Sequence, residues 1–248
     1  MSIAYTMPPA PHEKGGQSLN ECPRWFERSH EQELTILEID SFKQIRPLIR
    51  TIKLRNDPIP GFFPYLRSQI SLVEMEIDSL SPCALYVLQP NLDLITYLRN
   101  TFLELYGIDI LYLNEENTRI TYNYMEQIDC VISPPIVEVS IDDGPEPVPI
   151  LIDGLHRVML ARSLELNTVN VIKIEHIACP LIALPVGWEE VKIYDSVPRE
   201  ELKRRYRFKN REELIQWPRS SYANYERFLT GFSLQAKLGA LHTHKPPR

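Results

Sequence analysis

The sequence predicts an α/β fold of the mixed (α+β) type, built around one small sheet, and three observations support this prediction. Of the 248 residues, 44% are hydrophobic and 24% are charged, the balance of a globular rather than a disordered chain. Several short runs alternate between apolar and polar residues, the period of a half-exposed strand. Two segments between those runs carry apolar residues at helical spacing. The resulting order, strand, helix, strand, strand, helix, strand, suits a small mixed sheet.

The first half of this core contains one strand and one helix. Val73, Met75 and Ile77 alternate with acidic residues and predict a strand from about residue 70, which Ser81-Pro82 ends. Residues 91–106 predict a helix, with Asn91 or Asp93 as the N-cap and Gly107 at the C-terminal turn. The apolar face of that helix consists of Leu94, Ile95, Leu98, Phe102 and Leu105.

The second half of the core predicts a strand pair, a helix and a closing strand. The run 136–141 alternates, the run 148–152 is apolar, and turn residues at 142–145 lie between them. On this strand Glu138 is expected to face solvent. A helical stripe follows over 154–166, and 169–174 is a β-branched strand, after which His176 is expected at the surface.

The flanking regions divide the rest of the chain. We expect a mobile arm over 1–22 and an N-terminal extension over 23–69. The extension contains a strand at 34–39, a stretch from Phe42 to Leu54 with helical spacing that Pro47 interrupts, and a turn at 57–61. The core spans 70–178, and a helical C-terminal region spans 179–248. The densest positive charge, 199–211, is either a solvated helix face or a platform for an anionic partner.

Composition excludes several classes of function. The net charge of -6 does not favour general binding to a nucleic-acid backbone. The four cysteines show neither CxxC pairing nor zinc-ligand spacing, which indicates reduced thiols in a cytoplasmic protein. No apolar run is long enough to span a membrane, and the first residues lack the features of a signal peptide. We therefore expect no membrane partner.

The segment from Ile150 to Arg157 carries the clearest chemistry. An apolar strand ends at Asp153, Gly154 permits an unusual backbone angle, and a helix begins at once. The first backbone N–H groups of a helix, here at Gly154 and Leu155, point at any anion placed there, and the helix dipole favours negative charge. His156 and Arg157 add side-chain donors suited to phosphate. This arrangement predicts binding of nucleotide phosphates.

Asp153 has two interpretations that stay open. A carboxylate beside a phosphate site is repelled unless a cation lies between them, and Mg²⁺ bound by one carboxylate and nucleotide phosphates is a common arrangement. Alternatively, Asp153 caps the helix and fixes the turn.

These segments resemble a known superfamily. The run 133–139, then Ile150 to Ala161, then 169–174, is similar to the ParB/sulfiredoxin superfamily and its ParB N-terminal-like domain. The resemblance covers about 70–178 and is strongest from 133 to 174. It implies a nucleotide-binding core in which Gly154, His156 and Arg157 contact phosphate.

The branches of that superfamily differ in chemistry. Sulfiredoxins place a catalytic cysteine immediately before the His-Arg pair, and this chain has Leu155 there, so we do not expect a sulfiredoxin reaction. The partition proteins bind CTP with Gly-x-Arg-Arg and continue into a helix-turn-helix. This chain has His156 in place of the first Arg and no convincing helix-turn-helix pattern. CTP and nucleic acid are therefore not favoured.

The segment is most similar to the free-serine kinase branch. That resemblance implies phosphate transfer from ATP or ADP to a small hydroxyl-bearing acceptor, with Asp153 and His156 at the metal and phosphates. The acceptor needs a general base, for which Asp78 is the candidate. The alternative is a non-catalytic nucleotide-dependent switch, or a ParB-like protein that associates with nucleic acid. Nuclease activity would need a carboxylate cluster that the sequence lacks.

Overall fold

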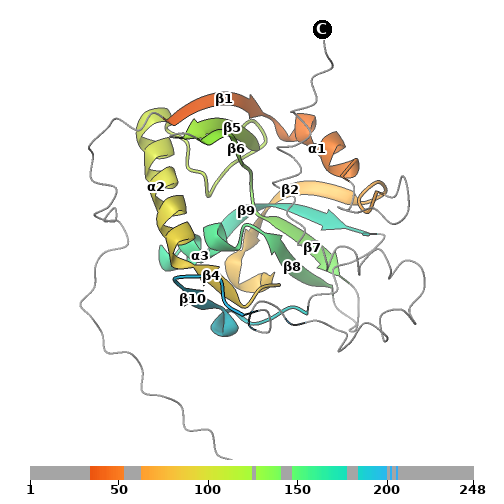
Figure 1. Cartoon of the computed structure of the whole chain (residues 1–248). Helices are drawn as coiled ribbons and strands as arrows, with labels where there is room; N and C mark the ends of the chain where they lie inside the picture. Colours follow the sequence, from red (N-terminus) through yellow and green to blue (C-terminus); the bar gives the residue numbers. More distant parts are fainter. Residues whose placement is uncertain are drawn as a thin grey trace, which may run out of the picture.

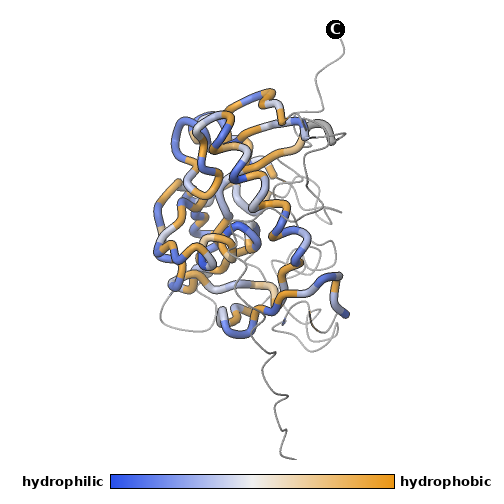
Figure 2. The backbone as a smooth tube through the Cα atoms, turned by 90° about the vertical axis from the view of Figure 1, so that its left-hand side faces the viewer, coloured by the Kyte–Doolittle hydropathy of each residue, from blue (hydrophilic) through white to orange (hydrophobic). Residues whose placement is uncertain are grey.

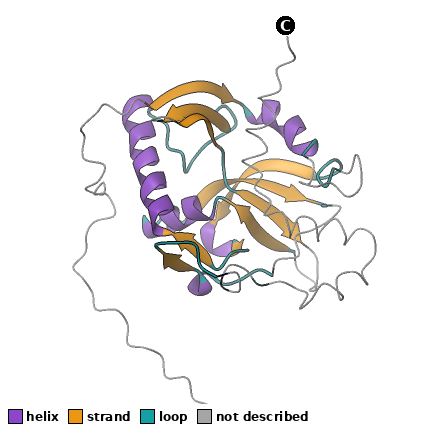
Figure 3. Cartoon of the chain, in the orientation of Figure 1, coloured by secondary structure: helices purple, strands orange, loops and turns teal. Residues whose placement is uncertain are grey.

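The computed structural model describes residues 34–52, 63–124, 127–140, 147–177 and 184–199, together with 202 and 205. Helices and strands mix as predicted, which confirms the α+β fold class (Figures 1 and 3). The expected arm over 1–22, the turns at 57–61 and 142–145, and most of the C-terminal region with its basic run lie outside the described residues. The predicted division into four segments stays a prediction.

The central sheet has five strands in the order β2-β9-β7-β8-β3. The predicted strand pair is confirmed, because β7 and β8 are antiparallel neighbours. β2 also runs antiparallel to β9, whereas β7 pairs with β9 and β3 with β8 in parallel. Ser81-Pro82, expected only to end a strand, itself forms β3 at the sheet edge, where a proline without an N–H is tolerated. The strands are β2 (Gln69–Glu76), β3 (Ser81–Pro82), β7 (Ile136–Ser140), β8 (Val148–Asp153) and β9 (Thr168–Glu175).

Different helices cover the two faces of this sheet. On one face Phe42, Ile45 and Ile49 of α1 (Phe42–Arg50) pack against sheet residues such as Ile172. On the other face, α3 (Leu155–Ser163) contributes Val158 and Ala161 to a second core with Val137, Leu151 and Val171. Because both faces are buried, the central strands are rich in Val and Ile.

Glu138 corrects one expectation, because it is 1% exposed rather than facing solvent. It lies on β7 between Ile150 of β8 and Ile174 of β9, on the sheet face that α1 covers. The hydroxyl of Tyr65 donates a hydrogen bond to its Oε1. Alternation along β7 correctly placed Glu138 on the sheet face opposite to Val137. It could not reveal that a helix and a tyrosine cover that face.

A second sheet was predicted only in part. β1 (Leu34–Asp40) was expected, but its partners β5 (Arg119–Tyr124) and β6 (Gln127–Ile132) were not. The order is β1-β5-β6 with antiparallel pairing. Arg119 is fully buried and pairs with Asp40 across β1 and β5. Figure 2 shows hydrophobic and hydrophilic positions interleaved along the described parts of the chain.

The long helix α2 (Gln89–Tyr106) packs Leu98 and Phe102 against the second sheet. Gly107 ends it with a φ of 65°, as expected. The predicted N-cap at Asn91 or Asp93 is wrong, because α2 begins at Gln89 with Leu88 as N-cap and a proline in its first turn. Leu105, expected on the apolar face, is exposed.

A small parallel pair, β4 (Tyr86–Leu88) with β10 (Lys192–Tyr194), lies beside the start of α2. Among the described residues, Ile77–Ser79 and Trp188–Glu190 form short 3₁₀ helices. No helix in the described segments is long and apolar enough to cross a membrane.

Candidate phosphate-binding site

The predicted glycine turn joins β8 directly to α3. Asp153 is the last residue of β8, Gly154 has a φ of 86°, and α3 begins at Leu155. A Cβ atom at Gly154 would lie 2.8 Å from the Cα of Pro135 and from Nη2 of Arg157. Two separate constraints, the left-handed backbone and the close neighbours, therefore require glycine at this turn.

The first turn of α3 offers backbone donors at this point. The first helical hydrogen bond in the turn runs from the N–H of Val158 to the carbonyl of Gly154. The N–H groups of Leu155 and His156 precede that bond, and no side chain caps the helix within the described segments. The start of α3 thus has the donors and the dipole that favour an anion.

Arg157 places a buried positive charge beside the same turn. Its side chain folds back over Gly154, and the residue is only 5% exposed. Nη2 of Arg157 lies 3.7 Å from Oδ2 of Asp153. Burial lowers the pKa of the Arg157 guanidinium, while the nearby Asp153 and the Tyr122 hydroxyl act to raise it. Tyr122 belongs to β5, so the second sheet also contributes to the surroundings of this guanidinium.

Asp153 presents a carboxylate whose two oxygens differ. Oδ2 is buried and has no hydrogen-bond partner within the part of the chain that the structure describes, although Arg157 is nearby. The side chain keeps 20% of its surface exposed, so a ligand can reach part of it. Burial raises the pKa of the Asp153 carboxyl, and Arg157 and the Gly154 N–H partly oppose that shift. A cation or a proton at this carboxylate would each relieve the cost of burying its charge.

The side chains at this turn fit magnesium only if a bound phosphate supplies some of the ligands. No cluster of three or more His, Cys, Asp or Glu side chains occurs among the described residues, so the protein does not build a complete cage there. Asp153 can offer one hard oxygen, which is enough for Mg²⁺ when phosphate oxygens and water supply the remaining ligands. The metal interpretation of Asp153 therefore depends on a bound phosphate.

His156 connects the start of α3 to the start of α2. The backbone N–H of Leu88 donates a hydrogen bond of 3.0 Å to Nε2 of His156, although the two residues are 68 positions apart. Burial and the charge of Arg157 lower the pKa of His156 to about 4. The ring is therefore neutral at pH 7 and carries its proton on Nδ1, which is the one ring atom that can donate to a phosphate.

Asp78 lies far from this turn. It is in the 3₁₀ helix Ile77–Ser79, its side chain is 87% exposed, and it forms an ion pair with Arg162. Arg162 is in the last turn of α3, about 12 Å along the helix axis from Gly154 at 1.5 Å per residue. The structure thus brings together Asp153, Gly154, Leu155, His156 and Arg157, and it leaves Asp78 at the opposite end of α3.

Two neighbours of the site were not found from the sequence. Leu88 contributes a backbone N–H, which any residue except proline would provide, so its identity carries no signal. Tyr122 lies in a strand that was not predicted, and only the alternation of buried and half-buried residues along β5 could have indicated it.

The fold and this turn define a class of protein, an α+β domain in which a mixed sheet leads through a glycine turn into the start of a helix. The ParB CE domain family matches residues 45–192, more than half of the 248-residue chain. The chain therefore belongs to the ParB CE domain family, which confirms the expected relation to ParB proteins. The match begins within α1 and ends at β10. Searches of curated proteins and of solved structures found no match.

Proposed function

We propose that this protein binds the phosphates of a nucleotide, ATP or ADP, at the start of α3. The observation that carries the proposal is the buried guanidinium of Arg157, which lies against the left-handed Gly154 turn where a helix begins. A buried cation next to backbone donors suits a multiply charged anion. Membership of a ParB-type family supports the same conclusion.

Each residue then has a distinct part in binding. The N–H groups of Leu155 and His156 donate to phosphate oxygens, and Arg157 supplies charge from the opposite side. The neutral ring of His156 donates from Nδ1, since Leu88 occupies Nε2. Asp153 would hold Mg²⁺ through its carboxylate when a nucleotide is bound, and that cation would reduce the charge repulsion between Asp153 and the phosphates.

A second candidate function is phosphate transfer, as in the free-serine kinase branch, and the raised pKa of Asp153 favours it. A carboxylate with a raised pKa is a better proton acceptor near neutral pH. In this step the hydroxyl oxygen of a small acceptor bonds to the terminal phosphorus, and the bond from that phosphorus to the nucleotide breaks. The acceptor proton passes to Asp153, which in this candidate function acts as the base and does not hold Mg²⁺, and the shortened nucleotide leaves. Asp78 takes no part, because it lies at the other end of α3.

Binding is tested by thermal unfolding of the full chain with ATP, ADP, CTP and GTP, each with and without Mg²⁺. A nucleotide at a hundredfold excess over its dissociation constant stabilises the folded state by about 2.7 kcal/mol. We expect a higher melting temperature with ATP or ADP, and a smaller rise for Arg157→Gln. Failure of every nucleotide to raise the melting temperature would refute the proposal.

Transfer is tested separately with γ-labelled ATP and small hydroxyl-bearing acceptors, free serine first. We expect label on the acceptor with wild type and at least a hundredfold slower transfer with Asp153→Asn, the scale of a lost general base. Nucleotide binding without any transfer would favour the non-catalytic switch, the alternative within the same family.

A further inference from the structure

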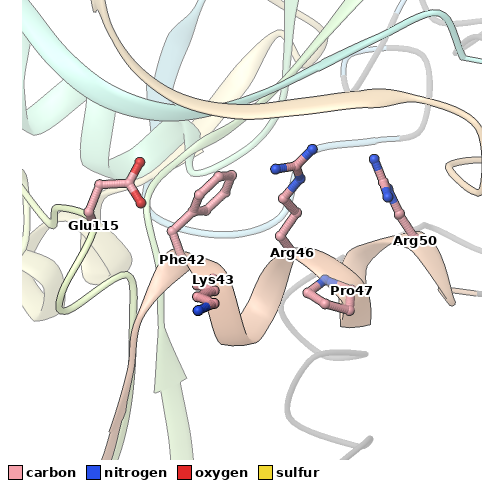
Figure 4. Close-up of a pocket in the computed structure, with 6 residues that line it drawn as sticks. All are labelled: Phe42, Lys43, Arg46, Pro47, Arg50 and Glu115. Atoms are coloured by element: carbon pink, nitrogen blue, oxygen red, sulfur yellow. The ribbon is translucent and has the colours of Figure 1, made fainter.

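A second positively charged site lies on α1, on the sheet face opposite to α3. A pocket of about 530 Å³ opens along this helix (Figure 4). Its volume falls in the range of small-molecule sites. The residues that line it are Phe42, Lys43, Arg46, Pro47, Arg50 and Glu115. Because α1 and α3 pack against different faces of the sheet, this pocket is separate from the candidate site described above.

Three cations line the pocket at helical spacing. Lys43, Arg46 and Arg50 follow one another along α1 at intervals of three and four residues, over about 10 Å of helix. In Figure 4 the guanidinium groups of Arg46 and Arg50 extend together, whereas the amino group of Lys43 points away from them. No carboxylate within the described segments lies within 4 Å of any of them, whereas Arg99, Arg119 and Arg162 each pair with an aspartate. Among the described residues, no ion pair therefore compensates the charge of these three cations.

Arg50 adds an independent observation. Its Nε atom is buried and has no hydrogen-bond partner among the described residues. A buried donor without an acceptor costs free energy, and proteins rarely leave one unless a ligand or water satisfies it. Figure 4 shows the guanidinium groups of Arg46 and Arg50 extending to the same side of the helix. An acceptor placed between them would meet both.

Glu115 does not cancel this charge. It lies at the Phe42 end of the pocket, far from Arg50 in Figure 4, and its carbonyl accepts a hydrogen bond of 2.8 Å from the N–H of Phe42. A carboxylate near the N-terminus of a helix is stabilised by the helix dipole, which gives Glu115 a structural reason to be there. The Arg46 and Arg50 end of the pocket therefore stays positive.

We propose that this pocket binds the di- or triphosphate group of a small molecule. Two or three linked phosphates are long enough to reach both Arg46 and Arg50, and their several negative charges match the concentration of positive charge on α1 better than one phosphate does. Arginine recognises phosphate oxygens with paired donors, and lysine adds a point charge. The partly apolar wall of Phe42 and Pro47 accommodates the remainder of such a molecule.

The test is calorimetric titration of the full chain with inorganic tripolyphosphate, at low salt and then at 0.5 M NaCl. We expect the double variant Arg46→Gln/Arg50→Gln to weaken this binding roughly tenfold to a hundredfold at low salt. The matched control Arg67→Gln/Lys192→Gln removes two exposed cations outside the pocket and should change affinity less than about threefold. Equal losses in both double variants would show general electrostatics and overturn the proposal, as would equal affinity in wild type and Arg46→Gln/Arg50→Gln.

Two further arms keep the result decisive. Arg157→Gln separates the sites, because it should remove a binding step at α3 and leave the step at α1. Loss of all tripolyphosphate binding in Arg157→Gln would overturn the α1 site. Loss of all binding only in Arg46→Gln/Arg50→Gln would refute the α3 proposal. Glu115→Gln removes a negative charge at the Phe42 end of the pocket and should leave binding unchanged or tighten it by no more than about fivefold. Weaker binding in that variant overturns the proposal, and so does binding of a short oligonucleotide without any binding of tripolyphosphate.

Discussion

The backbone N–H of Leu88, at the start of α2, donates a hydrogen bond to Nε2 of His156 in the first turn of α3. This bond fixes the neutral form of the imidazole and orients Nδ1 as the remaining donor. It also joins two helices that the sequence separates by 68 positions. His156 is therefore as much a part of the fold as of the candidate site.

This bond predicts an acid-sensitive stability. The pKa of His156 falls from 6.5 to about 4 on folding, so between these values the unfolded chain binds more protons than the folded chain. The unfolding free energy therefore decreases as the pH falls from about 6.5 to about 4, by on the order of 2 to 3 kcal/mol. Urea unfolding at pH 7 and pH 4.5 measures this loss.

The matched variant is His156→Gln, which keeps an acceptor for Leu88 but cannot be protonated. Carboxylates titrate in both proteins, so their effect cancels in the comparison. Because only wild type can protonate residue 156, the difference in unfolding free energy between wild type and this variant should shrink or reverse at pH 4.5. The same pH dependence in both proteins would show that His156 is not buried as a neutral ring.

Gly154 should tolerate substitution much less than Gly107. Both have positive φ, at 86° and 65°, but a Cβ at Gly154 meets Pro135 at 2.8 Å whereas a Cβ at Gly107 meets nothing within 4 Å. We expect Gly107→Ala to cost about 1 kcal/mol and Gly154→Ala about 2 to 4 kcal/mol. Chemical denaturation measures both, and equal costs would contradict the described packing of the turn.

Tyr65 should stabilise the fold through the buried Glu138. Tyr65→Phe removes the hydroxyl that donates to Oε1 of Glu138 and is expected to cost about 1 to 3 kcal/mol. Tyr86→Phe is the control, since its hydroxyl makes no hydrogen bond within the described segments, and it should cost less than about 0.5 kcal/mol. An unchanged unfolding free energy in Tyr65→Phe would mean that Glu138 faces solvent instead.

Asp78 should be dispensable for nucleotide binding. Its exposed ion pair with Arg162, which also lies 4.8 Å from the ring centre of Trp188, is a surface contact at the far end of α3. We expect Asp78→Asn to lower the unfolding free energy by less than about 1 kcal/mol and to leave ATP affinity within about twofold. Loss of phosphate transfer in Asp78→Asn, with binding intact, would support Asp78 as the base instead.

The sequence was sufficient for the segment from β7 to β9 because local signals there agree. Alternation predicted β7, an apolar run predicted β8, and Gly154 marked the start of α3. The glycine signal is reliable because the positive φ excludes most other residues at that position. The residues that form the candidate turn were all found for this reason.

Long-range relations could not be predicted in the same way. Arg119 pairs with Asp40 from another strand, and Glu138 is buried because α1 and Tyr65 cover its face. Each of these contacts depends on how distant segments pack. The periodicity of one segment carries no information about that packing. The start of α2 was misplaced because Asn91 is a favourable N-cap residue by type, although the backbone before it already continues from β4 into the helix.

The most direct test of the central claim compares ATP with adenosine by equilibrium titration of wild type and Arg157→Gln. If the start of α3 binds phosphates, wild type binds ATP, adenosine binds at least a hundredfold more weakly, and Arg157→Gln loses roughly tenfold or more in ATP affinity. Adenosine binding as tight as ATP, or ATP binding that is unchanged in Arg157→Gln, would contradict a phosphate site at this turn.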